Sequence, residues 1–202
     1  IWNDTMKKWC MYMSINGNEW HSAIVLLTAD KIEGPYEYVD EVIFSGCFGS
    51  ADASASAESS TIKADKTVEY DGAEAKMTMT VTFSPYSETV SRVDYADIKQ
   101  VLKLGENDAI PTRYTTDPVT TGTANVNCID PNVQYDDEGN LWMTYGSWSA
   151  GIFQIKLDTK TGLRDYEYEY GEYVKDKVDP YLGYKLAGGY YNSGEAPYLL
   201  KA

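Results

Sequence analysis

The chain has 202 residues, with 31 acidic and 17 basic side chains and a formal net charge of −14. Because phosphate contact needs clustered Lys and Arg, this charge excludes a general nucleic-acid-binding protein. A content of 43% hydrophobic and 13% aromatic residues is enough to bury a core, which excludes disorder for most of the chain. No run of about 18 apolar residues occurs, so the sequence predicts no membrane-spanning helix.

The first part of the chain predicts a set of antiparallel strands. Short runs rich in Val, Ile, Thr, Tyr and Trp alternate with Gly and Pro, which is typical of an all-β fold. An acidic turn leads into a strand that carries Trp9, Tyr12 and Ser14, and a second strand follows at residues 23–30. A tight turn and a Tyr-rich strand at residues 36–38 complete this unit.

The middle of the chain is irregular. Residues 50–60 are small and polar, which is typical of a linker or a mobile loop. Residues 77–83 alternate in polarity as a strand does, so we interpret residues 50–90 as an insertion with a hairpin. Residues 91–126 form an irregular connection, in which residues 93–102 predict one or two helical turns.

A second unit repeats the first in degenerate form. Trp142, Tyr145 and Ser147 follow an acidic turn and match the Trp, Tyr and Ser of the first unit. A strand at residues 151–158 and a Tyr-rich strand at residues 166–170 come next. Such units pack face to face in a β-propeller, and two of them cannot close a ring. We therefore expect an all-β fold that forms part of a propeller.

The two ends of the sequence agree with a piece of a longer protein. The chain starts at Ile1, and residues 198–202 resemble the first part of a strand. The predicted segments are 1–49 (propeller blade), 50–90 (insertion with a hairpin), 91–126 (irregular connection), 127–188 (propeller blade) and 189–202 (the start of the next blade, truncated).

Two carboxylates, Asp130 and Glu195, stand out by their context. Proline follows Asp130 directly and follows Glu195 after one intervening residue. Proline commonly marks the first residues of a strand, and the innermost strand of each propeller blade begins near the central axis. Carboxylates at such strand starts converge from different blades, and paired carboxylates are the machinery of glycoside hydrolysis. Because most acidic residues are simply exposed, the alternative is a turn cap for Asp130 and a solvated loop for Glu195.

The sequence around these carboxylates resembles a known family. Residues 127–152, which begin Asn-Cys-Ile-Asp-Pro-Asn, resemble the central signature of family 43 glycoside hydrolases, closest to the endo-α-1,5-L-arabinanase group. Residues 161–164 (Thr-Gly-Leu-Arg) and 187–198 (Ala-Gly-Gly-Tyr-Tyr-Asn-Ser-Gly-Glu-Ala-Pro-Tyr) continue the resemblance. Residues 3–35 resemble an earlier blade of secreted bacterial members, and residues 50–90 lie outside the resemblance.

The resemblance implies a five-bladed β-propeller of antiparallel blades that cleaves glycosidic bonds with inversion. It implies that Glu195 is the general acid and that Asp130 orients this acid and tunes its pKa. A like charge at Asp130 raises the pKa of Glu195, as a general acid near neutral pH requires. The family's general base lies in the first blade, and no residue of this chain matches it.

The resemblance also implies substrate-binding residues. Trp148 matches an aromatic residue near the family's cleft, and Asn127 and Ser147 match polar positions that contact the sugar or order the site. The ring of Trp148 fits core packing equally well. No residue matches the His that accompanies Ca²⁺ in the family, and His21 receives no role. We therefore expect no metal or other cofactor in this chain, with Ca²⁺ left open for the full-length protein.

Other polar residues receive structural interpretations. Cys10 is predicted to be a small buried strand residue, and no pair among Cys10, Cys47 and Cys128 has metal-ligand spacing. A disulfide between Cys10 and Cys47 stays open. Asp176 and Asp179 lie in a loop rich in Lys and Asp, which indicates a solvated surface rather than a metal site.

The sequence thus predicts a bacterial glycosidase that is secreted, cell-surface or periplasmic. We expect a monomer whose partner is a neutral plant polysaccharide, arabinan or arabinoxylan, because the acidic chain would repel an anionic one. Two alternatives stay open. One is an exo-acting arabinofuranosidase or β-xylosidase of the same family, and the other is a non-catalytic carbohydrate-binding propeller.

Overall fold

The computed structural model describes most strands of the two repeated units and short parts of the region between them. Among the described residues, no helix is long and apolar enough to cross a membrane. His21, Cys47 and the predicted linker at residues 50–60 lie outside the described residues. The described residues are 1–16, 22–44, 61–63, 67–70, 73–76, 80–82, 98–105, 107–114, 126–148, 150–189 and 194–199.

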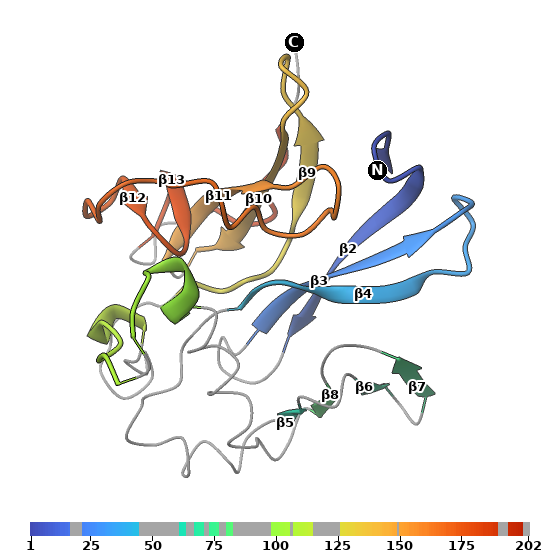
Figure 1. Ribbon diagram of the computed structural model, residues 1–202, viewed down its shortest axis with the longest axis horizontal. Coiled ribbons are helices and arrows are strands. Elements are labelled where there is room, and N and C mark those ends of the chain that lie inside the picture. Colours follow the sequence, from blue (N-terminus) through green and yellow to red (C-terminus); the bar gives the residue numbers. More distant parts are fainter. Residues whose placement is uncertain are drawn as a thin grey trace.

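The first unit forms a four-stranded antiparallel sheet in the order β1-β2-β3-β4 (Figure 1). Residues 23–26 of β3 are 0% exposed, because both faces of this strand are covered, and such strands read as continuous apolar runs. The strands are β1 (Trp2–Asn3), β2 (Lys8–Asn16), β3 (Ser22–Ala29) and β4 (Glu37–Phe44).

The second unit forms a five-stranded antiparallel sheet in the order β12-β13-β11-β10-β9. Its central hairpin pairs Leu141 with Leu157 at one end and Ser147 with Gly151 at the other. The strands are β9 (Asn132–Tyr135), β10 (Leu141–Ser147), β11 (Gly151–Leu157), β12 (Val178–Asp179) and β13 (Gly183–Ala187).

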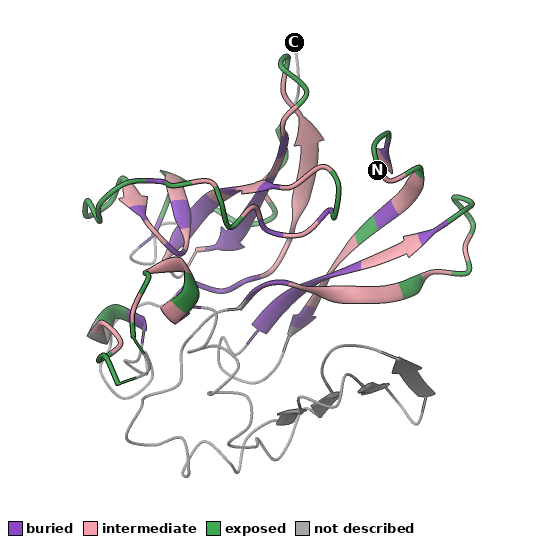
Figure 2. Ribbon diagram, in the orientation of Figure 1, coloured by how far each residue is buried: buried purple, intermediate pink, exposed green. Residues whose placement is uncertain are grey.

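The two sheets share one hydrophobic core. Figure 2 shows that buried residues concentrate on β3, β10 and β11, which agrees with their burial patterns. Ile24 and Leu26 from the first sheet belong to the same buried cluster as Met143 and Ile155 from the second. The sheets therefore form one body, with β1 and β9 as the strands that open the two units.

The structure confirms the all-β class, and the two repeated hairpins are present. Trp9, Tyr12 and Ser14 lie on β2, and their counterparts Trp142, Tyr145 and Ser147 lie on β10. The turn before β10 is the predicted acidic hairpin turn, which the bond from Asp136 N to Asn140 O closes at 2.9 Å.

The predicted Tyr-rich strand at residues 166–170 is wrong. This segment is a turn followed by irregular chain, and the strand beside β11 is β13 instead. Asp165 starts the turn, because its carboxylate accepts a bond from Glu167 N at 3.0 Å. The side chain of Tyr170 then holds the segment on the sheet: its hydroxyl accepts a bond from Lys156 N at 2.7 Å, and its ring lies 5.2 Å from Tyr184.

Short elements occupy the region between the units. Residues 98–101 form one helical turn, in agreement with the sequence, and a 3-10 turn, η2 (Thr112–Tyr114), follows. Residues 194–199 contain no strand, and residues 200–202 lie outside the described part of the chain. Two small antiparallel pairs lie within the predicted insertion: β5 (Thr61–Lys63) with β8 (Thr80–Thr82), and β6 (Thr67–Tyr70) with β7 (Ala73–Lys76).

Candidate functional site

Asp130 lies where β9 begins, at the end of the sheets where β10 finishes. Its backbone has φ 55°, the left-handed region that residues other than Gly seldom adopt, and Pro131 follows it. The preceding residue joins this turn to β10, because Gly146 N donates to Ile129 O at 3.0 Å. Because strained backbone clusters at functional sites, this conformation makes Asp130 a candidate site residue on structural grounds as well.

The segment from Asn127 to Asp130 is held by side chains of the first sheet. Asp130 N donates to Ser14 Oγ at 2.9 Å, across 116 residues of sequence. Cys128 N donates to Ser22 Oγ at 2.9 Å, and Ser22 Oγ donates in turn to Asn127 Oδ1 at 2.5 Å. The end of the β2–β3 hairpin therefore supports the start of β9.

Glu195 lies on an exposed segment that contacts the beginning of β9. Leu199 N donates to Asn132 Oδ1 at 3.1 Å, which joins the segment of Glu195 to a residue two positions after Asp130. Ala196, between Glu195 and the following proline, has φ 48°. Each of the two predicted carboxylates thus lies at a left-handed turn that precedes a proline, and Glu195 is exposed to solvent.

The three predicted substrate-binding residues lie near this turn but differ in exposure. Asn127 is 7% exposed, and its side chain is bonded to Ser22, so it orders the segment before Asp130. Ser147 is 1% exposed at the end of β10. Trp148 lies in the turn between β10 and β11 and is half-buried. Trp148 is therefore the most accessible of the three residues, and sugar contact by each of them stays a prediction.

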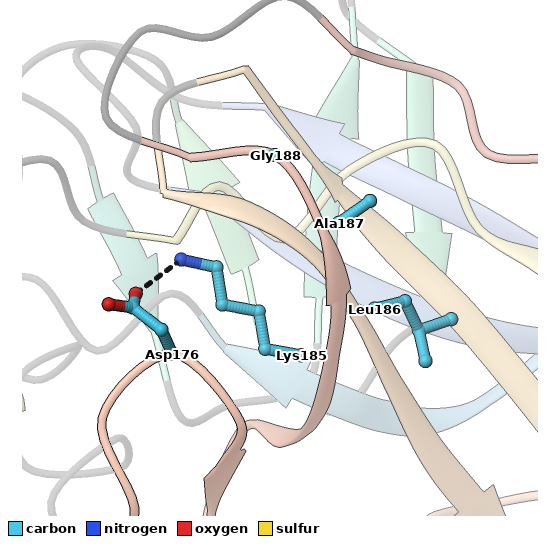
Figure 3. A pocket seen from close by; sticks show the side chains of 5 residues that line it. All are labelled: Asp176, Lys185, Leu186, Ala187 and Gly188. Atoms are coloured by element: carbon cyan, nitrogen blue, oxygen red, sulfur yellow. Dashed lines mark hydrogen bonds and ion pairs between the residues drawn. The ribbon is translucent and has the colours of Figure 1, made fainter.

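A separate open pocket of about 220 Å³ lies beside β13 (Figure 3). Asp176 and residues 185–188 line it, and Lys185 Nζ lies 2.9 Å from Asp176 Oδ1. Asp130 and Glu195 are not among its lining residues. This pocket therefore does not bring the predicted carboxylates together.

The prediction that Asp179 is solvated is wrong. Its side chain is 5% exposed, and Arg113 Nε lies 3.0 Å from Asp179 Oδ2. Tyr114 Oη and the backbone N–H groups of Tyr181 and Leu182 also donate to Asp179 Oδ1. Burial raises the pKa of Tyr114, and the neighbouring carboxylate adds to the shift. Asp179 is thus a structural anchor for the connection that carries η2.

The other candidate ligands do not assemble a metal site. Among the described residues, no three His, Cys, Asp or Glu side chains lie together as a metal site requires. Cys10 and Cys128 are buried free thiols. The predicted burial of Cys10 is confirmed, and this burial raises the pKa of Cys10.

The supporting serines, Ser14 and Ser22, were not recognised in the sequence as site residues. Ser14 was seen only as a member of the repeat, matched to Ser147. This match was the only hint in the sequence, because Ser147 was itself a predicted site residue.

Comparison with known proteins gives matches to arabinanases. A 74-residue stretch, 37% of this chain, is 46% identical to the extracellular endo-alpha-(1->5)-L-arabinanase of Thermotoga petrophila and covers 13% of that protein. A 78-residue stretch, 39% of this chain, is 37% identical to the extracellular endo-alpha-(1->5)-L-arabinanase 2 of Bacillus subtilis and covers 14% of it. No family model matches the chain.

The crystal structure of endo-1,5-alpha-L-arabinanase from Thermotoga petrophila aligns with 100% of this chain and 29% of its own, at a TM-score of 0.54 and 26% identity. These matches confirm the resemblance to endo-arabinanases that the motifs indicated. The structural relative is an arabinanase propeller, and the two large antiparallel sheets of the described residues do not close a ring. The chain spans only a minor part of the relatives that it matches.

Proposed function

We propose that the protein containing this chain is an extracellular bacterial glycosidase that hydrolyses α-1,5-linked arabinan with inversion. The observation that carries the proposal is the bond from Leu199 N to Asn132 Oδ1, which joins the segment that carries Glu195 to the strand that begins just after Asp130. The arabinanase relatives support arabinan as the substrate and the outside of the cell as the location. The neutral polymer also suits an acidic chain that we expect to be a monomer.

In this proposal the two carboxylates have different roles. Glu195 protonates the leaving-group oxygen, and Asp130 orients Glu195 for this proton transfer. An inverting enzyme also needs a general base about 6.5–9.5 Å from the acid, with room for the attacking water. We assign this base to a residue outside this chain, because no residue here matches it.

The direct test is the variant Glu195→Gln in the full-length protein, assayed on linear arabinan, debranched arabinan and xylan. We expect kcat on arabinan to fall by about 10²–10⁴, because proton donation to the leaving group is lost. The matched control is Glu172→Gln, which makes the same change at an exposed glutamate in the second unit and leaves kcat unchanged. Full activity of Glu195→Gln would overturn the assignment.

Product sizes separate the alternatives. Internal cleavage releases oligosaccharides of mixed length early in the reaction, whereas an exo-acting arabinofuranosidase or β-xylosidase releases monosaccharide from the start. A protein that binds arabinan but releases no sugar is the non-catalytic propeller. The proposal predicts the first result, on arabinan and not on xylan.

A further inference from the structure

In the turn that carries Asp130, three consecutive backbone N–H groups have hydrogen-bond acceptors. Three consecutive N–H groups donate: Cys128 to Ser22 Oγ at 2.9 Å, Ile129 to Asn127 O at 3.0 Å, and Asp130 to Ser14 Oγ at 2.9 Å. Two of the three acceptors are serine hydroxyls from the first sheet. The backbone that presents Asp130 is therefore fixed by another part of the chain, more than 100 residues away in sequence.

This support has an energetic reason. A left-handed residue other than Gly costs about 1–3 kcal/mol and persists only where its surroundings determine it. At Asp130 the rigid ring of Pro131 and the bond to Ser14 act on the two sides of the strained residue. Without the Ser14 acceptor, the Asp130 amide would lose its partner, and the peptide would be free to rotate toward a relaxed conformation.

Ser22 holds the same turn one step earlier. It is 1% exposed, and its hydroxyl accepts from Cys128 N while it donates to Asn127 Oδ1. The Ser22 hydroxyl thus joins the backbone of Cys128 to the side chain of Asn127. Because β3 begins at Ser22 and Ser14 lies near the end of β2, both serines come from one end of one hairpin.

We propose that Ser14 and Ser22 are positioning residues for Asp130. Through these two serines, the first sheet sets the position of a carboxylate that belongs to the second unit. This inference rests on the proposed function, because it takes Asp130 as the residue that orients the acid. Neither serine has to touch the substrate. Their contribution is the position of the carboxylate, and a displacement of about 1 Å in a catalytic group can cost 10²-fold in rate.

The test uses Ser14→Ala, Ser14→Thr and Ser22→Ala in the full-length protein. We expect Ser14→Ala to lower kcat on arabinan by about tenfold or more with KM unchanged, because positioning and not binding is lost. Ser14→Thr keeps a hydroxyl on a residue suited to a strand and restores most of kcat. The matched control is Thr28→Ala, at the opposite end of the same hairpin, which leaves kcat unchanged.

A second readout does not depend on activity. Hydrogen exchange at the Asp130 amide should become at least about tenfold faster in Ser14→Ala than in wild type or Thr28→Ala, because its acceptor is gone. Ser22→Ala should do the same at the Cys128 amide. The inference would be overturned if hydrogen exchange were unchanged at both amides. It would also be overturned if kcat of Ser14→Thr were as low as kcat of Ser14→Ala. If Asp130→Asn and Glu195→Gln keep full kcat while the exchange results hold, the proposed function fails and the structural support of the turn stands.

Discussion

Tyr12 on β2 donates a hydrogen bond from its hydroxyl to the carbonyl oxygen of Gly162, 2.7 Å away in the turn after β11. The two residues are separated by 150 positions and belong to the two different repeated units. Burial raises the pKa of Tyr12, which keeps its proton available for donation. The repeated units are therefore joined by a polar contact as well as by their common core.

Removing this hydroxyl should destabilise the contact between the sheets. Tyr12→Phe keeps the ring but leaves the Gly162 carbonyl without its donor, so the free energy of unfolding should fall by about 1 kcal/mol. Urea titration followed by tryptophan fluorescence measures the change. Tyr36→Phe is the matched control, because the Tyr36 hydroxyl donates to Ile32 O within one exposed turn. Equal effects of the two substitutions would contradict a role for Tyr12 between the sheets.

Gly146 should not tolerate a side chain. Its φ is +121°, and a Cβ there would lie 2.2 Å from Gly151 O in the neighbouring strand. We expect Gly146→Ala to lower the free energy of unfolding by about 3 kcal/mol, since backbone strain and overlap act together. Gly139→Ala isolates the backbone cost, because φ is +81° there and nothing lies within 4 Å of the new Cβ. We expect Gly139→Ala to lower the free energy of unfolding by about 1 kcal/mol. An equally small loss for Gly146→Ala would contradict the close approach of β10 and β11.

Much of the fold could be predicted because the repeated strands carry large residues at fixed positions. Trp9 and Trp142 each follow an acidic turn, and the alternation of the next residues indicated strands without knowledge of their partners. The Tyr-rich segment at residues 166–170 shows the same alternation but is not a strand. Its tyrosines are held by ring contacts and by the Tyr170 hydroxyl, which depend on β11 and β13 being folded beneath them.

The candidate site could be predicted in part, because two of its residues have signals in the nearby sequence. Asp130 and Glu195 have local signals, namely a nearby proline and a motif that resembles a family. Ser14 and Ser22 have no local signal for their contacts, because their partners lie 116 and 106 residues away. The prediction for Asp179 failed because charged residues lie near it in the sequence, whereas its partners Arg113 and Tyr114 lie 66 and 65 residues earlier.

Asp179 should contribute strongly to stability. Asp179→Asn removes the negative charge that pairs with Arg113 and replaces one acceptor oxygen with an NH₂ donor. We therefore expect the free energy of unfolding to fall by about 3 kcal/mol. Asp30→Asn is the matched control, since Asp30 is 82% exposed and Lys8 is 40% exposed in their pair. An exposed pair of this kind contributes less than about 1 kcal/mol. In thermal unfolding, Asp179→Asn should have a clearly lower melting temperature than the control variant. Similar melting temperatures would contradict the role of Asp179 as a structural anchor.

Asp136 should make stability depend on acid. Hydrogen bonds from the Asn140 side chain, the Trp142 indole and two backbone N–H groups lower its pKa from 3.8 to about 2. The folded state therefore favours the ionised form, and this stabilisation is present above pH 3.8 and lost as the pH falls to about 2. The difference in melting temperature between wild type and Asp136→Asn should be largest near about pH 5 and should shrink below pH 3.8. A constant difference over this range, or the same profile for Asp137→Asn, would contradict the prediction.

The role of Glu195 as the acid is tested most directly by comparing two leaving groups in the Glu195→Gln variant of the full-length protein. Linear arabinan needs a proton on its departing sugar oxygen, whereas an aryl arabino-oligosaccharide with an acidic phenol does not. We expect kcat to fall by about 10²–10⁴ on arabinan and by much less on the aryl substrate. Equal losses on the two substrates, or no loss on arabinan, would contradict the account.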